Sequence, residues 1–202
     1  MLAANSASVR PQGGVRGLSL ARGLALAELL VVLAVLAILA AVIVPSVVRR
    51  VSGGAAAGLA GDLKGLSDGI AAFRQDLRRY PLELFHLSTP PGATDRDACG
   101  QLLPDPGRWK GPYVNRVIPR GGIQTRAGII VDTLRRVPAT LALGQVATLF
   151  IDVRDVDSVV AAEVERAFDG EASDYGAGTV RWTAGIEPRR GTLSFAVPIR
   201  GC

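Results

Sequence analysis

The chain has 202 residues, with 23 Lys and Arg against 18 Asp and Glu and a formal net charge of +5. It holds one His and two Cys, which excludes a metal site built on several histidines and a disulfide-dense scaffold. Three cationic residues, Arg10, Arg16 and Arg22, precede the first apolar segment, and without them the charge is nearly balanced. Nucleic-acid binding is therefore not predicted.

The first element is an apolar segment from Leu29 to Val48, in which Ser46 is the most polar side chain. At about 1.5 Å per residue, a helix over this segment is roughly 30 Å long and matches the hydrocarbon core of a bilayer. Glu28 stands at its edge, five residues after Gly23. Because a carboxylate in lipid is costly unless it meets a cation, the pattern predicts a membrane helix that is cut and then assembled.

These residues resemble the N-terminus of type IV pilins and type II secretion pseudopilins. The family pattern is a basic leader, a Gly before the scissile bond, a hydrophobic first mature residue, Glu as the fifth mature residue and an apolar helix with a Pro in its outer third. Here the pattern falls on Gly23, Leu24, Glu28 and Pro45. The resemblance implies cleavage after Gly23, N-methylation of Leu24, and filament assembly through the helix that carries Glu28 and Pro45.

Two other interpretations of the N-terminus are a secretory signal peptide and a plain single-pass anchor. A signal peptide has an apolar core of about 7–15 residues, shorter than this segment, and a plain anchor has no need of Glu28. Three arginines before the segment, against Arg49 and Arg50 after it, favour a cytoplasmic N-terminus. The resemblance implies the same topology, with a single pass through the inner membrane and the C-terminal domain in the periplasm.

Helical periodicity continues beyond the membrane segment. Apolar side chains recur every three or four residues and predict a helix with one face buried against the C-terminal domain: Val51, Ala55, Leu59, Leu63, Leu66, Ile70, Phe73 and Leu77. Tyr80-Pro81 is expected to end this helix, because the residue before Pro is disfavoured in helical geometry. One helix is therefore predicted from about Leu24 to about Arg79, and Pro45 is expected to kink or locally melt it.

Glycine is frequent in this second half, and Gly61, Gly65 and Gly69 recur on one helical face. Small residues permit the close approach of neighbouring helices in a filament. They also weaken a helix, by about 1 kcal/mol for each Gly relative to Ala. Both interpretations stay open, and under either one the helix needs tertiary support.

Residues 80–113 are rich in Pro and Gly and predict a loop. Two stretches, Phe73-Arg74 through Tyr80-Pro81 at the end of the helix and Trp109–Tyr113 in the loop, resemble the segment that follows the helix in the major pseudopilin of type II secretion. The resemblance favours a secretion pseudopilus over a type IV pilus.

Strand patterns begin after Gly128. The expected strands are Ile129–Val131 with Leu134–Val137, Thr140–Val153 with a bend at Gly144, Val180–Thr183, and Leu193–Ile199. One long helix packed on an antiparallel sheet is an α+β architecture. The resemblance implies that this architecture is a pilin-like fold.

A second helix is expected over Asp155–Phe168. Apolar residues recur there every four positions, at Val156, Val160, Val164 and Phe168. Asp155 or Asp157 is the expected N-cap, and Gly170 lies beyond the expected end.

No catalytic constellation is visible, no cofactor is predicted, and the chain is expected not to be an enzyme. His86 lies in a Pro-flanked loop and is expected to be a surface or packing residue. A calcium site at Asp169, Glu171 and Asp174 is an alternative to a solvated loop after the second helix. Their order does not match an EF-hand, and no other metal site is predicted.

Cys99 and Cys202 are the only cysteines. In an oxidising compartment two lone cysteines usually pair, and closing this long loop would stabilise the fold by roughly 4–5 kcal/mol in a chain-entropy treatment. The resemblance supports a disulfide near the C-terminus. Two free thiols and an intermolecular bridge remain alternatives.

The expected organisation has four parts: a basic leader over 1–23, a transmembrane and assembly helix over 24–48, its amphipathic half over 49–80 and a periplasmic α+β domain over 81–202. The resemblance implies a structural subunit of a type II secretion pseudopilus, processed by prepilin peptidase and polymerised through its N-terminal helix. The alternatives are a type IV pilus subunit for adhesion, motility or DNA uptake, and an anchored periplasmic domain that does not polymerise.

The resemblance also implies the partners. These are further copies of the chain, other pilin-like subunits, the prepilin peptidase and methyltransferase, an inner-membrane assembly platform, and the lipid bilayer before assembly. No nucleic-acid partner is expected, because the charge of the processed chain is nearly balanced.

Overall fold

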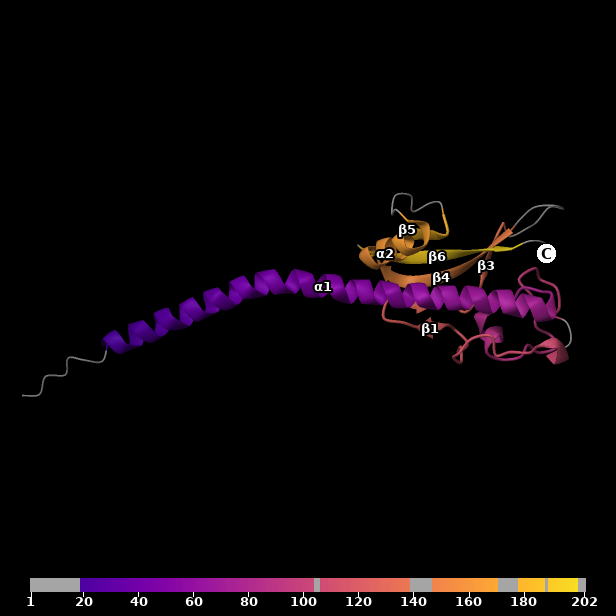
Figure 1. Ribbon diagram of the computed structural model, residues 1–202, viewed down its shortest axis with the longest axis horizontal. Coiled ribbons are helices and arrows are strands. Elements are labelled where there is room, and N and C mark those ends of the chain that lie inside the picture. The colour runs from indigo at the N-terminus through magenta and orange to yellow at the C-terminus, as the bar shows by residue number, and fades with distance from the viewer. Residues whose placement is uncertain (1–18, 104–105, 139–146, 171–177, 188, 200–202) are drawn as a thin grey trace, which may run out of the picture. The chain divides into compact units, whose positions relative to one another are not determined.

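The computed structural model describes residues 19–103, 106–138, 147–170, 178–187 and 189–199 (Figure 1). The chain divides into two compact units, Met1–Val48 and Arg49–Cys202, and each is described by itself. The first unit contributes the N-terminal half of helix α1. The second holds the rest of α1, an antiparallel sheet and helix α2. The fold is α+β, as predicted.

Helix α1 (Ser19–Leu77) begins earlier and ends earlier than predicted. Its backbone is helical through Pro45, so the local melting expected there is absent. The helix ends before Tyr80-Pro81, because Arg78 turns into the left-handed region with φ +58°. The Arg78 N–H donates to the Arg74 carbonyl at 2.9 Å, which closes the last turn.

The apolar stripe of the second half of α1 is confirmed from Leu59 to Leu77, where every predicted member is buried. Ala55 is half-buried, and Val51 is 67% exposed, contrary to the prediction. The buried core of the domain begins at Ala56, and Val51 lies more than one turn of helix before it.

The three glycines expected on one face of α1 differ in their surroundings. A Cβ built on Gly69 would lie 2.9 Å from Val114 Cγ1 and 3.2 Å from the Tyr113 carbonyl oxygen. The same atom on Gly61 or Gly65 would meet nothing within 4 Å. Close packing inside the domain therefore requires glycine at position 69, whereas the other two positions are open.

The sheet has six antiparallel strands in the order β1-β2-β4-β6-β5, with β3 also paired to β4. The strands are β1 (Ile123–Gln124), β2 (Ile129–Ile130), β3 (Arg135–Val137), β4 (Ala147–Asp157), β5 (Val180–Ala184) and β6 (Arg190–Ile199). All four predicted regions contain strands, but the first, expected as one candidate over Ile129–Val131 with Leu134–Val137, is divided into β2 and β3, which pair separately with β4. β1 was missed because two residues carry no alternating pattern. The predicted bend at Gly144 lies outside the described residues.

Alternation along β4 directs Leu149, Ile151 and Val153 into the core, where they meet the stripe of α1 and the buried face of helix α2 (Ser158–Asp169). In the second unit, α1 and α2 lie beside the sheet in Figure 1. Phe150 and Asp152 point to the other face of the strand, where both contact Arg135. The Arg135 guanidinium lies 4.8 Å from the centroid of the Phe150 ring and 2.8 Å from the Asp152 carboxylate.

The prediction that a helix begins at Asp155 is wrong by three residues. Val156 belongs to β4 and pairs with Gly191, after a register shift that begins at Val153. Asp155 has φ +63° in this bulge, which returns the buried Val156 to the core face. The four-residue spacing of Val156 from the first buried valine of α2 was therefore coincidental.

Both ends of α2 follow the sequence signals. The Asp157 carboxylate accepts a hydrogen bond from the Val159 N–H at 2.9 Å and caps the first turn. Gly170 follows the last residue with φ +90°, where a side chain would be strained. Phe168, near the C-terminal end, packs its ring 4.8 Å from that of Phe195 on β6.

The region predicted as a loop contains two short 3-10 turns, η1 (Leu84–Leu87) and η2 (Pro106–Arg108). It is otherwise irregular, as predicted. Backbone bonds tie its first part to the segment before β3: the Leu84 N–H donates to the Asp132 carbonyl, and the Leu134 N–H donates to the Leu82 carbonyl, both at 2.8 Å.

Candidate functional site

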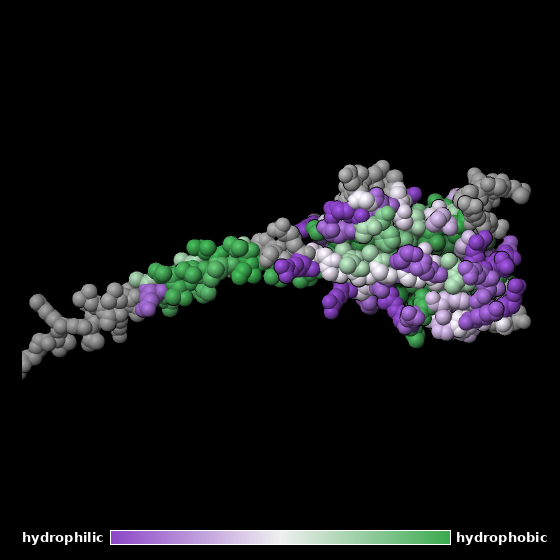
Figure 2. Space-filling view, viewed as in Figure 1, coloured by the Kyte–Doolittle hydropathy of each residue, from purple (hydrophilic) through white to green (hydrophobic). Residues whose placement is uncertain are grey.

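The N-terminal half of α1 contains one stretch long and apolar enough to cross a membrane, Leu26–Val44. None of this stretch is buried within the chain. Its large side chains are exposed in every direction around the axis, from 50% at Val35 to 72% at Val42. Figure 2 shows the hydrophobic colour covering the visible side of this helix. A helix that is apolar all round requires lipid or other helices as its surroundings.

Glu28 is the only ionisable residue within Leu26–Val44, and its side chain is exposed. Leu24 precedes it by four residues, which is about one turn of α1. Gly23 and Leu24 have helical backbone, and Pro45 directly follows the apolar stretch. The predicted processing and assembly residues therefore share one helical segment, in which the stretch Leu26–Val44 carries a single ionisable residue.

The C-terminal half of α1 is anchored to the loop by aromatic packing. The Tyr113 ring lies edge-on to Phe73 of α1 at 5.7 Å and to Trp109 at 5.6 Å. Its hydroxyl donates to Asp76 on α1 at 2.9 Å. Burial raises the pKa of the Tyr113 phenol, and the Asp76 carboxylate raises it further. The Trp109–Tyr113 stretch therefore forms part of the surface against which the C-terminal half of α1 packs.

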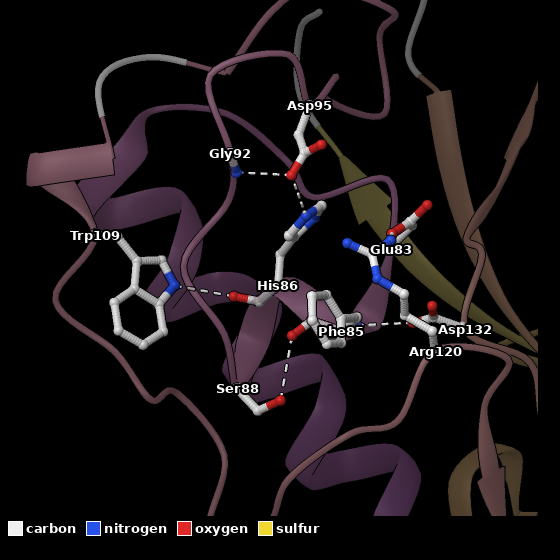
Figure 3. Close-up of polar contacts among 9 residues, drawn as sticks. All are labelled: Glu83, Phe85, His86, Ser88, Gly92, Asp95, Trp109, Arg120 and Asp132. Carbon is white, nitrogen blue, oxygen red and sulfur yellow. Dashed lines mark hydrogen bonds and ion pairs between the residues drawn. The ribbon is translucent and has the colours of Figure 1, made fainter.

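A buried His86 organises the loop around η1 (Figure 3). Its side chain is 2% exposed, and Nε2 lies 2.9 Å from Oδ2 of Asp95. The same carboxylate oxygen accepts from the Gly92 N–H at 2.7 Å, while the His86 carbonyl accepts from the Trp109 indole at 2.9 Å. His86 was expected to be a surface or packing residue, and its burial makes it a packing residue.

The environment of Asp95 favours its charged form. The Gly92 N–H holds the pKa of this carboxyl below its ordinary value, against burial, which raises it, and His86 lowers it further. Ser88 is the serine closest to His86 in the sequence, but its hydroxyl donates to the Phe85 carbonyl and accepts from the Ile118 N–H. The hydroxyl is thus held by backbone groups, and Figure 3 shows it away from the imidazole.

Asp169, one of the three alternative calcium ligands, lies at the end of α2. Its two carboxylate oxygens accept from the Thr179 N–H at 3.0 Å and from the Val180 N–H at 2.8 Å. Burial raises the pKa of Asp169, but these backbone donors outweigh it and hold the pKa below its usual value. Glu171 and Asp174 lie outside the described residues. Among those that are described, no three His, Cys, Asp or Glu side chains are grouped to hold a metal.

Cys99 is disulfide-bonded and lies in a tight turn, where the Asp97 carboxylate accepts from the Cys99 and Gln101 N–H groups. Cys202 lies outside the described residues. The pairing of these two cysteines therefore stays a prediction.

Comparison with protein-family models, with curated proteins and with solved structures finds no match for the chain. The apolar helix and Glu28 were predictable from the sequence, because both are local patterns. The Asp76–Tyr113 and His86–Asp95 contacts were not, because nothing in the spacing of these residues signals that they meet.

Proposed function

We propose that this chain is a structural subunit of a type II secretion pseudopilus, with a pilin-like fold. On this proposal a prepilin peptidase cuts after Gly23, and the mature chain polymerises through its N-terminal helix. The chain spans the inner membrane once before assembly, with its C-terminal domain in the periplasm. It is a structural protein and has no enzymatic activity of its own.

The observation that carries the proposal is the uncovered apolar stretch Leu26–Val44 with one carboxylate, Glu28, near its start. A plain anchor gains nothing from a charge in lipid. A polymerising helix does, because cleavage after Gly23 creates a cationic amine on Leu24 that also needs a counterion. Opposite charges attract strongly where the dielectric is low, and each is costly if left alone.

Glu28 on one subunit therefore pairs with the Leu24 amine of its neighbour. Within one chain the two residues lie one turn apart, so a neighbour displaced slightly along the axis brings its amine beside the carboxylate. The apolar side chains around them then replace lipid with other helices. This ion pair sets the axial register of the filament.

The choice of pseudopilus over pilus is supported by the region after the helix. Tyr80 is 7% exposed, and Trp109 and Tyr113 pack against the loop and against α1. These are the residues that resemble the post-helix segment of the major pseudopilin. Because these residues pack against α1 and its loop, the stretch that carries the resemblance also holds the helix against the domain.

The decisive experiment is the N-terminal sequence and intact mass of the full chain from membranes with and without a prepilin peptidase. A chain that starts at Leu24 only when the peptidase is present, with or without one added methyl group, supports the proposal. A chain that starts at Met1 in both cases, or that is cut beyond Val48, contradicts it.

Assembly is tested separately with Glu28→Gln, which removes the charge and keeps the size. The matched control is Asp68→Asn, also on α1, whose exposed carboxylate pairs with Lys64 at 2.6 Å. Glu28→Gln is expected to be cut normally and to lose the sheared or pelletable filament fraction, while Asp68→Asn retains it. Normal assembly of Glu28→Gln would remove the ion-pair mechanism. Surface fibres without any effect on secretion would indicate a type IV pilus.

A further inference from the structure

An open groove runs beside α1 in the Arg49–Cys202 unit. Its volume is about 340 Å³, and its lining residues are Gly61, Asp62, Gly65 and Leu66 of α1 with Tyr113–Arg116. The groove is open because two glycines leave no side chain there, with nothing within 4 Å of a Cβ at Gly61 or Gly65. An apolar cavity of roughly 150 Å³ holds a benzene molecule, so this groove has room for a branched aliphatic side chain.

The groove combines apolar walls with a charged rim. Val114, which is half-buried, supplies aliphatic surface, and Leu66 lines the groove with 2% of its area exposed. At the rim, Arg116 Nη2 lies 3.0 Å from Asp62 Oδ1, and both side chains stay about one-third exposed, at 39% and 32%. Val117, the next residue in the chain, is 79% exposed. A ligand suited to this groove therefore has an aliphatic side chain flanked by charges of both signs.

The turn between β5 and β6 presents a group of this kind. Ile186 at its tip is fully exposed, at 105% of the reference area. Glu187 follows it directly, and Arg189 has φ +73° in the same turn. Both charged residues are exposed. The tip therefore matches the groove in its apolar group and in its two charges.

Backbone hydrogen bonds tie the ends of this turn, at Gly185 and Arg189. The Gly185 N–H donates to the Arg190 carbonyl at 2.8 Å, and the Ser158 N–H donates to the Arg189 carbonyl at 2.7 Å. Arg190 also pairs with Asp155 at 2.8 Å. These bonds restrict the backbone on both sides of Ile186, which reduces the conformational entropy lost on binding.

We propose that Ile186 of one copy inserts into the α1 groove of a second copy, with Glu187 meeting Arg116 and Arg189 meeting Asp62. Because the tip and the groove are different surfaces of the same chain, the contact is head-to-tail, and repeated copies form an open filament when the rotation between them does not close a ring. This contact rests on the proposed function, to which it adds a second point of attachment between the domains.

The contact is tested by placing the photo-crosslinker p-benzoylphenylalanine at position 186 of the full chain, in membranes that contain a prepilin peptidase. Mixed heavy- and light-isotope chains distinguish adducts between copies from those within one copy. Expected adducts join position 186 to peptides containing residues 61–66 or 113–117 of another copy. The matched control carries the crosslinker at Val159, which is 42% exposed on α2. Adducts to other peptides, or none, would overturn the proposal.

Filling the groove gives a second test with an internal control. Gly65→Leu projects into the groove, whereas Gly58→Leu lies on the same helix, also has nothing within 4 Å and does not line the groove. Leu is the better helix former, so neither change lowers thermal stability. Gly65→Leu and Ile186→Asp are each expected to weaken association by roughly ten- to a hundred-fold, and Gly58→Leu to leave it unchanged. An equal loss for Gly58→Leu would overturn the groove contact in favour of general helix packing.

N-terminal sequencing of the same samples separates the two proposals. A wild-type chain that stays uncut at Gly23 contradicts the filament function. The crosslink is read in cut and uncut chains alike, so it decides the contact between copies by itself.

Discussion

The hydroxyl of Tyr113 donates a hydrogen bond to Asp76 across 37 positions of sequence, with 2.9 Å between the two oxygens. The same hydroxyl accepts from the Lys110 N–H at 3.0 Å, while the ring packs on Phe73. One side chain thus joins the last turns of α1 to the loop that follows it. Since Tyr113 also lines the groove beside α1, this bond positions one wall of the proposed contact surface.

Removal of that hydroxyl by Tyr113→Phe is expected to lower the free energy of unfolding by about 1 kcal/mol, the usual net worth of one such bond. Tyr113→Leu is expected to cost more, because two aromatic contacts worth about 0.5–1.5 kcal/mol each are lost as well. Denaturant unfolding of the full chain in detergent measures both, with Asp68→Asn as a surface control. A Tyr113→Phe variant as stable as wild type would show that the bond contributes nothing net.

A second prediction compares Gly58, where a Cβ would have free space, with Gly69, where it would meet the loop. Gly58→Ala is expected to raise the free energy of unfolding by up to about 1 kcal/mol, because Ala is the better helix former and its Cβ meets nothing within 4 Å. Gly69→Ala is expected to lose that gain, because its Cβ would lie 2.9 Å from Val114 and overpacking costs about 1–3 kcal/mol. Thermal melts of the two variants side by side measure the difference. Equal stabilisation by both would contradict the tight packing at Gly69.

Much of the fold could be predicted because its signals are local. The stripe from Leu59 to Leu77 is a periodic pattern, and the caps Asp157 and Gly170 are single-residue signals next to a periodic helix. The prediction failed where contacts between residues distant in the sequence determine the secondary structure. Val156 fits a helical repeat, yet pairing with Gly191 places it in β4.

The candidate site divides in the same way. Glu28 and the apolar helix are visible in the sequence because a charge inside an apolar run is itself a local pattern. The sequence did not show that Gly69 is tightly packed while Gly61 and Gly65 are open, because this difference depends on the position of Tyr113 and Val114 in the loop. The burial of His86 beside Asp95 likewise depends on loop closure rather than on any repeat.

Acid sensitivity follows from the environment of Asp95. The Gly92 N–H, opposed by burial and aided by His86, lowers the pKa of this carboxyl in the folded chain from its usual 3.8. Because the folded pKa is the lower one, the stabilisation is complete above the unfolded-state pKa and is lost as pH falls through the folded value.

Wild type is therefore expected to lose stability more steeply than Asp95→Asn below about pH 4. Denaturant midpoints across that range measure the two slopes. His86→Gln is the informative companion: it is expected to reduce the difference without abolishing it, because the Gly92 bond remains. Parallel pH profiles for wild type and Asp95→Asn would contradict the assignment.

The last prediction concerns the disulfide at Cys99. The chain has two cysteines, so an intramolecular bond requires Cys202 as the partner. Non-reducing digestion and mass spectrometry are expected to recover one peptide pair joined through these residues. Removal by Cys99→Ser with Cys202→Ser is expected to cost roughly 2–4 kcal/mol, because the bond restricts the unfolded chain. Disulfide-linked dimers on a non-reducing gel, or full labelling of both thiols after unfolding, would contradict the intramolecular bond.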